Sequence, residues 1–462
     1  MIFTQSEFFA FFVIVFSLYW IIQSKSLQNV LLLVASYIFY GWVHPWFVLL
    51  IAASTLVDYN VGRELKNRPD RRKLLLIISL MFNLGMLGYF KYFNFFVSSF
   101  SDAFNYLGLI TNIATLEIFL PIGISFYTFQ TLSYTLDIYR GEMEPCDNFV
   151  DFALFVSFFP QLVAGPIERA KRFLPQIQAR RSWSWSRFTE GWQLIIEGFL
   201  LKVMVADSLA IYVNQIYMLQ NPSLFLLAVG TLAFAIQIYA DFHGYSQLAR
   251  GFAKMIGFDL ILNFNSPYLA ISPSDFWRRW HISFSSWIRD YLYIPLGGSR
   301  VKTQWQFFFV LCASLGLSGL WHGAAWHFVI WGLYHAVLVF TYHLLGIGGR
   351  WQPEGTAKTW FARLVMFALT LVGWMFFRAP SMAWLINAFS SMRVLGSGNT
   401  FATALAVLGL IFLFSIPILL LRKLKSIENN QSTLKNLGYA IAVFFILIYA
   451  GLGNQDFIYF QF

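Results

Sequence analysis

Three histidines lie close together in a stretch of the chain that is otherwise apolar. The stretch "GLWHGAAWHFVIWGLYH", residues 319–335, places His322, His327 and His335 among tryptophans, aliphatic residues and glycines. An ionisable side chain in such surroundings is unfavourable, and within a membrane protein it marks a functional site by default. The stretch therefore predicts a buried site that uses imidazole chemistry.

His322 is the strongest candidate of the three. Trp321 precedes it, and Gly319 and Gly323 flank it, so that a backbone or a ligand can approach closely. The other two histidines are more typical of packing or interfacial positions.

Several chemistries are open to such histidines. A neutral imidazole accepts a proton as a general base. Two histidines on facing helices could hold a haem. Zinc-protease chemistry is disfavoured, because "HGAAWH" lacks the glutamate of "HExxH". A buried histidine that only donates a structural hydrogen bond is the remaining interpretation.

A second histidine lies in "SPSDFWRRWHISFSSWIRDYLYIPLGGSR", residues 272–300. If this segment is helical, one apolar stripe consists of Trp277, His281, Phe284 and Ile288. The neighbouring stripe consists of Arg278, Ser285 and Arg289.

Two interpretations of that segment remain open. In the first, it is an interfacial amphipathic helix whose arginines meet lipid headgroups. In the second, His281 points into the protein, while Arg278 and Arg289 face an anionic cytoplasmic ligand. Arginine suits the second role, because its planar guanidinium binds phosphate in two places at once.

The elements that must position these residues are membrane helices. The chain has 462 residues, of which 58% are hydrophobic and only 12% charged, about half the charged share of a soluble domain. Apolar runs such as "FFAFFVIVFSLYWII" approach the roughly 20 residues that cross a bilayer. We expect an all-α polytopic membrane protein with about twelve spans and some shorter, broken segments.

The first residues, the cysteines and the net charge further limit the class of protein. The first residues lack the basic region and cleavage site of a signal peptide, so we expect a retained first span. Cys146 and Cys312 are too few and too separated for a disulfide framework or a cysteine metal site. The net charge of +10 is assigned to cytoplasmic loops and phosphate-bearing partners, since nothing resembles a nucleic-acid module.

Basic loops predict the orientation of the chain. The clearest are residues 62–73, 168–181 and 421–426, which the positive-inside rule places in the cytoplasm. Three spans precede the first loop, so the N-terminus is expected outside, and the count of spans places the C-terminus outside as well. The apolar stretch before residue 168 must then enter and return, as a re-entrant element broken near Pro160.

Three motifs together resemble the membrane-bound O-acyltransferase (MBOAT) family. They are "FFPQLVAGPIERA", "DFWRRWHISFSSWIRDYLYIPLGGSR" and "LWHGAAWHFVIWGLYHA". More narrowly, the motifs resemble the alginate O-acetyltransferase-like branch, near the teichoic-acid D-alanylation branch, and the likeness covers most of the chain. In "YADFHGYSQLARG" the sequence departs from the expected pattern, with His243 and Gln247 where serine and aspartate are expected.

The resemblance implies a fold and a set of site residues. The fold would be helices around a tunnel, with re-entrant and amphipathic helices lining it. His322 would be the essential catalytic histidine and His281 a second site residue. The residues expected to bind the donor or line the tunnel are Trp277, Arg278, Arg289, Asp290 and Trp321.

The resemblance also implies substrates and partners. The donor would be acetyl-coenzyme A or another cytoplasmic acyl thioester, with no bound cofactor and no metal. The acyl group would cross a bacterial inner membrane to O-acetylate an extracytoplasmic polysaccharide. A periplasmic SGNH-type acetyltransferase or a polysaccharide-synthesis complex would be the partner, in contact with the lipid bilayer and not with nucleic acid.

One tyrosine adds a further hypothesis. The final "GNQDFIYFQF" resembles a tyrosine-bearing tail of the D-alanylation system, so Tyr459 is a candidate acyl relay. The alternative is an aromatic anchor at the membrane interface.

The whole chain is expected to form one membrane domain. Residues 1–148 would be N-terminal helices, 149–347 the catalytic core, and 348–462 the C-terminal helices with an external tail. Two other functions remain open from the residues alone. One is a transporter or flippase, although no inverted repeat is visible, and the other is a bis-histidine redox protein.

Overall fold

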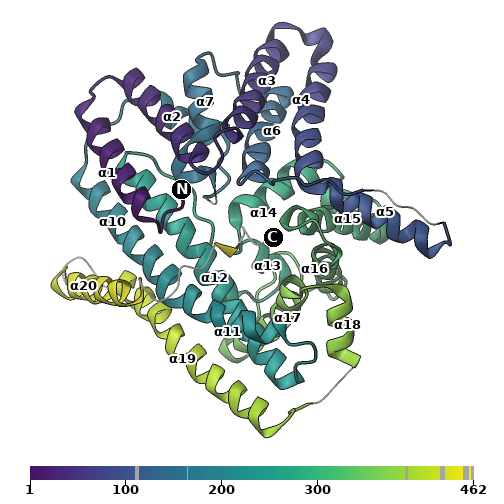
Figure 1. Ribbon diagram of the computed structural model, residues 1–462. Helices are drawn as coiled ribbons and strands as arrows, with labels where there is room; N and C mark the ends of the chain where they lie inside the picture. The colour runs from purple at the N-terminus through teal and green to yellow at the C-terminus, as the bar shows by residue number, and fades with distance from the viewer. Residues whose placement is uncertain (110–113, 164, 391–393, 427–431, 451–456, 459–462) are drawn as a thin grey trace. The chain divides into compact units, whose positions relative to one another are not determined.

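The computed structural model describes residues 1–109, 114–163, 165–390, 394–426, 432–450 and 457–458. Within these ranges every regular element is helical, as the sequence predicts (Figure 1). The chain divides into two compact units. The first unit comprises residues 1–192 and 249–261, and the second comprises residues 193–248 and 262–462.

The first unit is built from short and medium helices. In chain order they are α1 Ser6–Ile21, α2 Lys25–Gly41, α3 Phe47–Asn67, η1 Pro69–Arg71, α4 Arg72–Leu87, the π-helical η2 Gly88–Tyr92, α5 Phe93–Tyr106, α6 Ile124–Arg140, α7 Phe149–Ser157, α8 Phe159–Leu162, α9 Ala170–Gln178 and the beginning of α10 Trp185–Phe199.

A buried carboxylate joins α3, α4 and α6. Asp58 is fully buried, and its oxygens accept hydrogen bonds from Ser79 at 2.5 Å, Asn83 at 2.8 Å and Thr135 at 3.2 Å. A buried carboxylate is tolerated where hydrogen-bond donors replace water. Each of these bonds crosses from one helix to another, so this polar cluster holds three apolar helices together.

The predicted re-entrant segment is a broken helix. Asn148 begins α7 by accepting hydrogen bonds from the backbone of Val150 and Asp151. The helix stops at Phe158, whose backbone leaves the helical region, and α8 starts again with Pro160 in its first turn. The expected break is therefore present, while entry and return on one side of a membrane remain a prediction.

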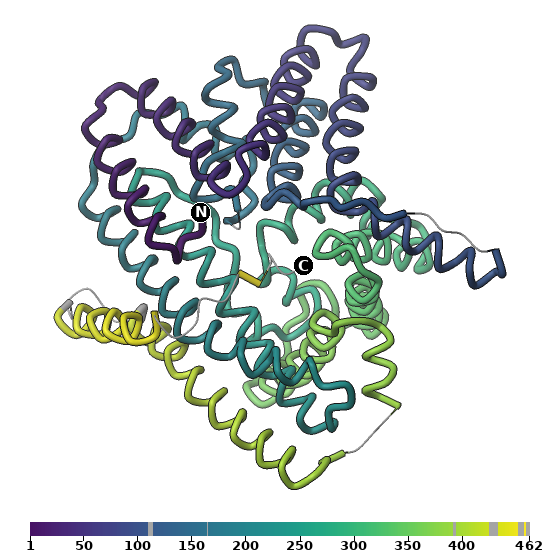
Figure 2. The backbone as a smooth tube through the Cα atoms, in the orientation of Figure 1, coloured from purple at the N-terminus to yellow at the C-terminus, as the bar shows by residue number. Residues whose placement is uncertain are grey.

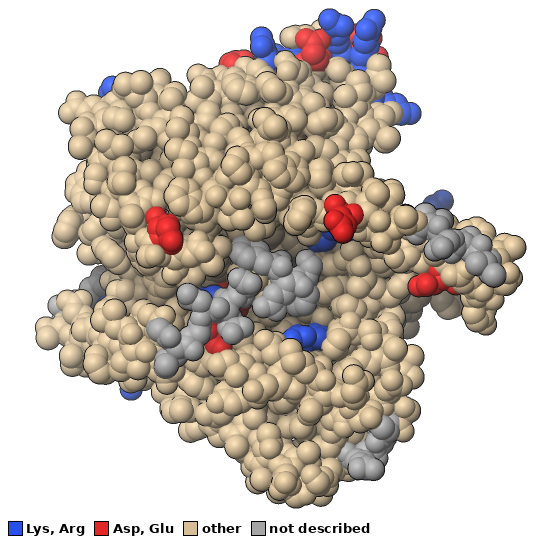
Figure 3. Space-filling view, viewed as in Figure 1, with Lys and Arg blue, Asp and Glu red and all other residues tan. Residues whose placement is uncertain are grey.

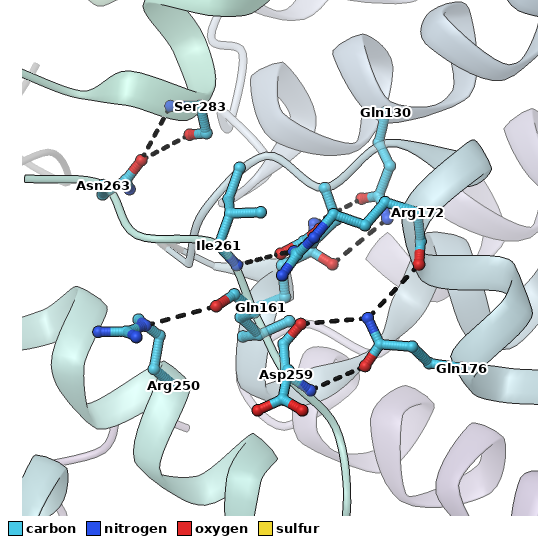
Figure 4. A network of polar contacts seen from close by, with 11 residues as sticks. Gln130, Gln161, Arg172, Gln176, Arg250, Asp259, Ile261, Asn263 and Ser283 are labelled. Carbon is cyan, nitrogen blue, oxygen red and sulfur yellow. Dashed lines mark hydrogen bonds and ion pairs between the residues drawn. The ribbon is translucent and has the colours of Figure 1, made fainter. Parts of the chain in front are cut away.

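Polar contacts connect α9 to the chain after α12 (Leu224–Met255) within the first unit (Figure 4). The Gln176 side chain accepts from Asp259 N at 2.8 Å and donates to Asp259 O at 3.2 Å. Ile261 N donates to the buried Glu168 at 2.6 Å, and Arg172 pairs with that same carboxylate at 2.8 Å. These bonds satisfy the backbone of an extended segment that belongs to no sheet.

The second unit contains both histidine motifs. Its elements are the rest of α10, the π-helical η3 Leu200–Ala206, α11 Asp207–Met218, α12 up to residue 248, η4 Pro267–Leu269, α13 Pro273–Trp277, α14 Ile282–Ile288, the π-helical η5 Arg289–Tyr293, η6 Gly298–Arg300, α15 Gln304–His322, α16 Trp326–Leu344, α17 Thr356–Arg378, α18 Met382–Ser390, α19 Gly398–Ser426 and α20 Ser432–Tyr449.

Several helices suit a bilayer. Among the described residues, those long and apolar enough to cross it lie at Pro69–Tyr106, Leu224–Met255, Trp326–Leu344, Thr356–Arg378 and Gly398–Leu424, and shorter apolar helices lie at Ser6–Ile21, Phe149–Leu162 and Thr433–Tyr449. Lipid would solvate their exposed apolar side chains, such as Phe412, which is 74% exposed. The number of about twelve spans stays a prediction.

Charged side chains are unevenly distributed on the visible face. Figure 3 shows them gathered where α3 ends and α4 begins, the region of the predicted basic loop. Ion pairs Arg68–Glu64 and Arg71–Asp70 lie there. Most of the remaining described surface on that face is uncharged. This distribution agrees with an apolar body and a polar loop.

Glycines allow α15 and α16 to pack backbone against backbone. An added Cβ on Gly332 would lie 2.0 Å from the Leu315 carbonyl oxygen, and one on Gly319 would lie 2.0 Å from the Phe328 carbonyl oxygen. Small residues at such crossings are typical of membrane helices, where close packing drives association. The glycines around His322 therefore admit a neighbouring helix, and α15 is helical without a break through His322.

We expect Gly332→Ala to destabilise the protein by more than about 2 kcal/mol, because backbone atoms cannot rotate away from the new methyl group. Thermal unfolding in detergent measures the change. Gly409→Ala is the matched control, since an added Cβ on that helical glycine meets nothing within 4 Å. Equal melting temperatures for the two variants would contradict the proposed close packing.

Candidate active site

His322 is the last residue of α15 and is only 3% exposed. Its Nδ1 lies 2.7 Å from the carbonyl oxygen of Ser318, one helical turn earlier. A carbonyl oxygen can only accept, so Nδ1–H is the donor, and Nε2 carries the lone pair of the neutral ring. The local helix thus selects the tautomer whose Nε2 can accept a proton.

Aromatic rings surround His322. The centroids of Trp321, Trp331, Phe284 and Phe377 lie 5.0, 5.1, 5.2 and 5.6 Å from that of His322, all at steep angles. Edge-to-face contacts of this kind fix ring orientation and exclude water. The imidazole is therefore enclosed largely by aromatic rings.

His281 is the second buried imidazole, and it is fully inaccessible. Its ring centroid lies 6.4 Å from that of His322. Phe284 touches both histidines, at 5.0 Å from His281 and 5.2 Å from His322. The tertiary structure thus brings together two histidines that are 41 positions apart in the sequence.

The expectation of one continuous helix through His281 is wrong. α13 ends at Trp277 and α14 begins at Ile282, with His281 between them in the left-handed region at φ +43°. A non-glycine residue in that conformation costs about 1–2 kcal/mol. The break turns His281 inward, and its burial agrees with the apolar stripe.

Asn263 holds the backbone next to His281 (Figure 4). Its carbonyl oxygen accepts from Ile282 N at 2.9 Å. Its side-chain oxygen accepts from Ser283 Oγ at 2.6 Å and from Ser283 N at 3.3 Å, and its amide donates to Ser246 at 3.3 Å. These bonds compensate for the strained conformation of His281.

Burial, with a smaller contribution from His322, holds the pKa of His281 well below its usual value. The ring is therefore neutral near pH 7. A neutral imidazole has one N–H donor and one acceptor, so it can orient a polar group without adding charge to the apolar site.

The predicted arginines lie at the edge of this region and contact protein groups. Arg278 is exposed, donates to Gly349 O at 2.9 Å and lies 3.6 Å from Asp275. Arg289 is also exposed and pairs at 2.6 Å with Asp290, the residue that follows it. Since both guanidinium groups already have partners, binding of an anion there remains a prediction.

The other two histidines of the motif differ from each other. His327 is half-buried beside Phe328, at 4.2 Å between ring centroids. His335 is buried and lies 5.1 Å from both Trp277 and Trp331. The structure thus connects His335, which the sequence favours as a packing residue, to the rings around His322.

Three buried nitrogens in this cluster lack a hydrogen-bond partner among the described residues. They are Nε1 of Trp277, Nε1 of Trp331 and Nδ1 of His335. Buried polar atoms are nearly always satisfied, so such a group next to a catalytic candidate suggests a ligand atom or a water.

Sequence reasoning missed the residues that orient the two histidines. Phe284 is named only as part of a stripe, and Asn263 carries no signal because its segment has no periodic pattern.

Tyr459 lies outside the described residues. In the described part of the chain, no group of three or more histidine, cysteine, aspartate or glutamate residues could hold a metal ion.

Comparisons with known proteins identify the family and relatives of this chain. A family model of membrane-bound O-acyltransferases matches residues 146–377, a range that includes both histidines. A probable alginate O-acetylase of Pseudomonas aeruginosa is 40% identical over 83% of this chain and 74% of its own length. A peptidoglycan O-acetyltransferase of Helicobacter pylori is 32% identical over 83% of this chain and 78% of its own. A teichoic acid D-alanyltransferase of Bacillus subtilis is 28% identical over 55% and 68%.

We expect Asn263→Ala to destabilise the protein by about 1–3 kcal/mol, because it removes the buried hydrogen bonds of the Asn263 side chain to Ser283 and Ser246. His281 should also react faster with diethyl pyrocarbonate, which mass spectrometry measures residue by residue. Asn60→Ala is the control, since that exposed side chain bonds only to Leu56 O of its own helix. Unchanged reactivity of His281 would refute the role of Asn263.

Proposed function

We propose a reaction for this chain from one premise: the chain belongs to the membrane-bound O-acyltransferase family. It is a membrane O-acyltransferase. We propose that it moves an acetyl or other short acyl group from a cytoplasmic thioester, such as acetyl-coenzyme A, across the membrane for O-acetylation of an extracytoplasmic polysaccharide. The observation that carries the mechanism is the buried His322, whose hydrogen bond to Ser318 leaves Nε2 basic.

The acceptor class follows from the relatives. The names of two of them specify O-acetylation of alginate or peptidoglycan, both polysaccharides. The third is named for transfer of D-alanine to teichoic acid, which is also an acyl transfer to a cell-envelope polymer. These names support an acyltransferase in preference to a transporter or a redox protein.

The chemistry explains why the site is buried in a membrane protein. Coenzyme A is too polar to leave the cytoplasm, and the accepting hydroxyl lies outside. A thin, protein-lined septum lets the small acyl group pass while coenzyme A remains behind. We propose that the protein lies in a bacterial inner membrane. The basic loops support an orientation with both termini outside.

In the proposed step, His322 acts as general base. Nε2 takes the hydroxyl proton while the hydroxyl oxygen attacks the thioester carbonyl carbon. The tetrahedral intermediate collapses, the C–S bond breaks, and the proton passes from Nε2 to the thiolate. One ester and one thiol result, and the histidine returns to its neutral form.

Two further groups are assigned to the developing negative charge. His281 is neutral and 6.4 Å from His322 between ring centroids, so it can orient the thioester or donate to the oxyanion. The indole N–H of Trp331 is buried and unpartnered among the described residues, next to His322. A donor already fixed in place stabilises an oxyanion without reorganisation.

The final transfer is assigned to a partner. We propose a periplasmic acetyltransferase of the SGNH type or a polysaccharide-synthesis complex that receives the exported acyl group. The support is the resemblance of the motifs to the alginate O-acetyltransferase-like branch.

We expect His322→Ala to lose about 10²–10⁴-fold in acyl transfer, the usual contribution of a positioned general base. The assay supplies radiolabelled acetyl-coenzyme A to purified protein in detergent and measures thioester loss and transferred label. His343→Ala is the control, because that histidine is exposed at the end of α16. Near-normal turnover of a correctly folded His322→Ala protein would eliminate the proposed mechanism.

In the same assay, His281→Ala should be severely impaired, with more residual activity than His322→Ala.

We also propose that Tyr459 relays the acyl group. Its phenol oxygen would attack the thioester, with release of the thiol, and an acceptor hydroxyl would then displace the phenol from the resulting ester. Tyr459→Phe should abolish label on the protein and lower transfer at least tenfold. Full activity of Tyr459→Phe would instead favour an interfacial anchor, which needs no hydroxyl.

A further inference from the structure

A buried ion cluster in the second unit has no role in the reaction proposed above. Lys202 of η3 contacts Asp207 at 2.8 Å and Asp241 of α12 at 2.9 Å. All three side chains are at most 6% exposed. Charges are unfavourable in an apolar interior unless they are paired and hydrogen-bonded, so a cluster this deep calls for a physical reason.

The second oxygen of Asp241 has a specific partner from a distant part of the chain. Oδ2 accepts a hydrogen bond from Ile458 N at 2.7 Å, across 217 positions in the sequence. Figure 2 shows residues 457–458 as a short yellow segment in the second unit. Because the acceptor is a carboxylate, this bond is stronger than an ordinary backbone hydrogen bond.

Ring contacts connect Phe457 to His281 through Phe242. Phe457 and Ile458 are 1% and 2% exposed. The Phe457 ring lies 5.9 Å from Phe242, and Phe242 packs at a steep angle against His281 at 4.6 Å. Phe242 follows Asp241 directly, so one short stretch of α12 holds the C-terminal residues on one side and supports His281 on another.

We infer that Asp241, balanced by Lys202, is a positioning residue that fixes Phe457 and Ile458 and thereby keeps Phe242 in place against His281. Lys202 places a positive charge 2.9 Å from the buried carboxylate of Asp241. One carboxylate oxygen of Asp241 contacts Lys202, and the other accepts a hydrogen bond from the backbone N–H of Ile458. The cluster is thus an anchor for the C-terminal residues, and only its effect on turnover rests on the proposed function.

Ile458→Pro removes the anchor bond, and it also fixes φ at position 458. Ile458→Pro eliminates the backbone N–H that donates to Asp241, whereas Ile458→Val keeps it with a similar apolar side chain. The first readout is the rate at which carboxypeptidase shortens the full-length protein in detergent. We expect shortening past position 458 to be at least tenfold faster in Ile458→Pro than in wild type, with Ile458→Val close to wild type.

The second readout is acyl transfer. Ile458→Pro should lower kcat at least tenfold while KM for acetyl-coenzyme A changes less than twofold, because the variant displaces a support of His281. A general loss of folding would instead lower the amount of active protein, which active-site titration and size-exclusion chromatography measure. Equal kcat in Ile458→Pro and Ile458→Val would overturn the positioning role.

Asp241→Ala, which leaves no acceptor oxygen for Ile458 N, provides an independent variant and a double-mutant cycle. It should also speed shortening by carboxypeptidase, and adding Ile458→Pro should change the rate less than twofold further, because both changes remove the same bond. Multiplicative effects would refute the anchor. The protease arm requires no turnover, so an inactive wild-type protein would contradict the proposed function and leave the anchor testable.

Discussion

The hydrogen bond from Nδ1 of His322 to the carbonyl oxygen of Ser318 determines which ring nitrogen can act as a base. It forms within one helical turn, so its geometry depends on α15 remaining helical to its last residue. That in turn depends on Gly319 and Gly332, which let the backbone of α16 approach and bring Trp331 against the imidazole. A change in helix packing would therefore alter the orientation of the proposed base.

The two histidines are positioned by opposite means. His322 takes its orientation from a regular helix, whereas His281 needs a break in the helix and a left-handed backbone. The break is stable because Asn263 supplies backbone and side-chain partners on the far side of it. Strained backbone of this kind is typical of functional sites. In a continuous helix, the direction of the His281 side chain would be set by the helical period alone.

Polar clusters organise what is otherwise an apolar protein. Asp58 joins three helices of the first unit, and Asp241 joins α12, η3 and the C-terminal residues of the second. Hydrophobic contacts between helices have little directional preference in lipid, so hydrogen bonds and close packing specify which helices meet. In each unit a buried carboxylate provides that specificity, and its hydrogen-bond partners remove the penalty of burial.

The sequence by itself determined the all-α membrane class and the family, because apolar length and long motifs are local properties, and it singled out His281 and His322 as candidates. It also located the break near Pro160, since proline lacks the backbone N–H that continues a helix. Only the tertiary structure decided that His281 leaves the helix, that Asn263 and Phe284 orient the site, and that Asp241 meets Ile458. These contacts join positions far apart in the chain, and no periodic pattern records which distant backbone will supply a partner.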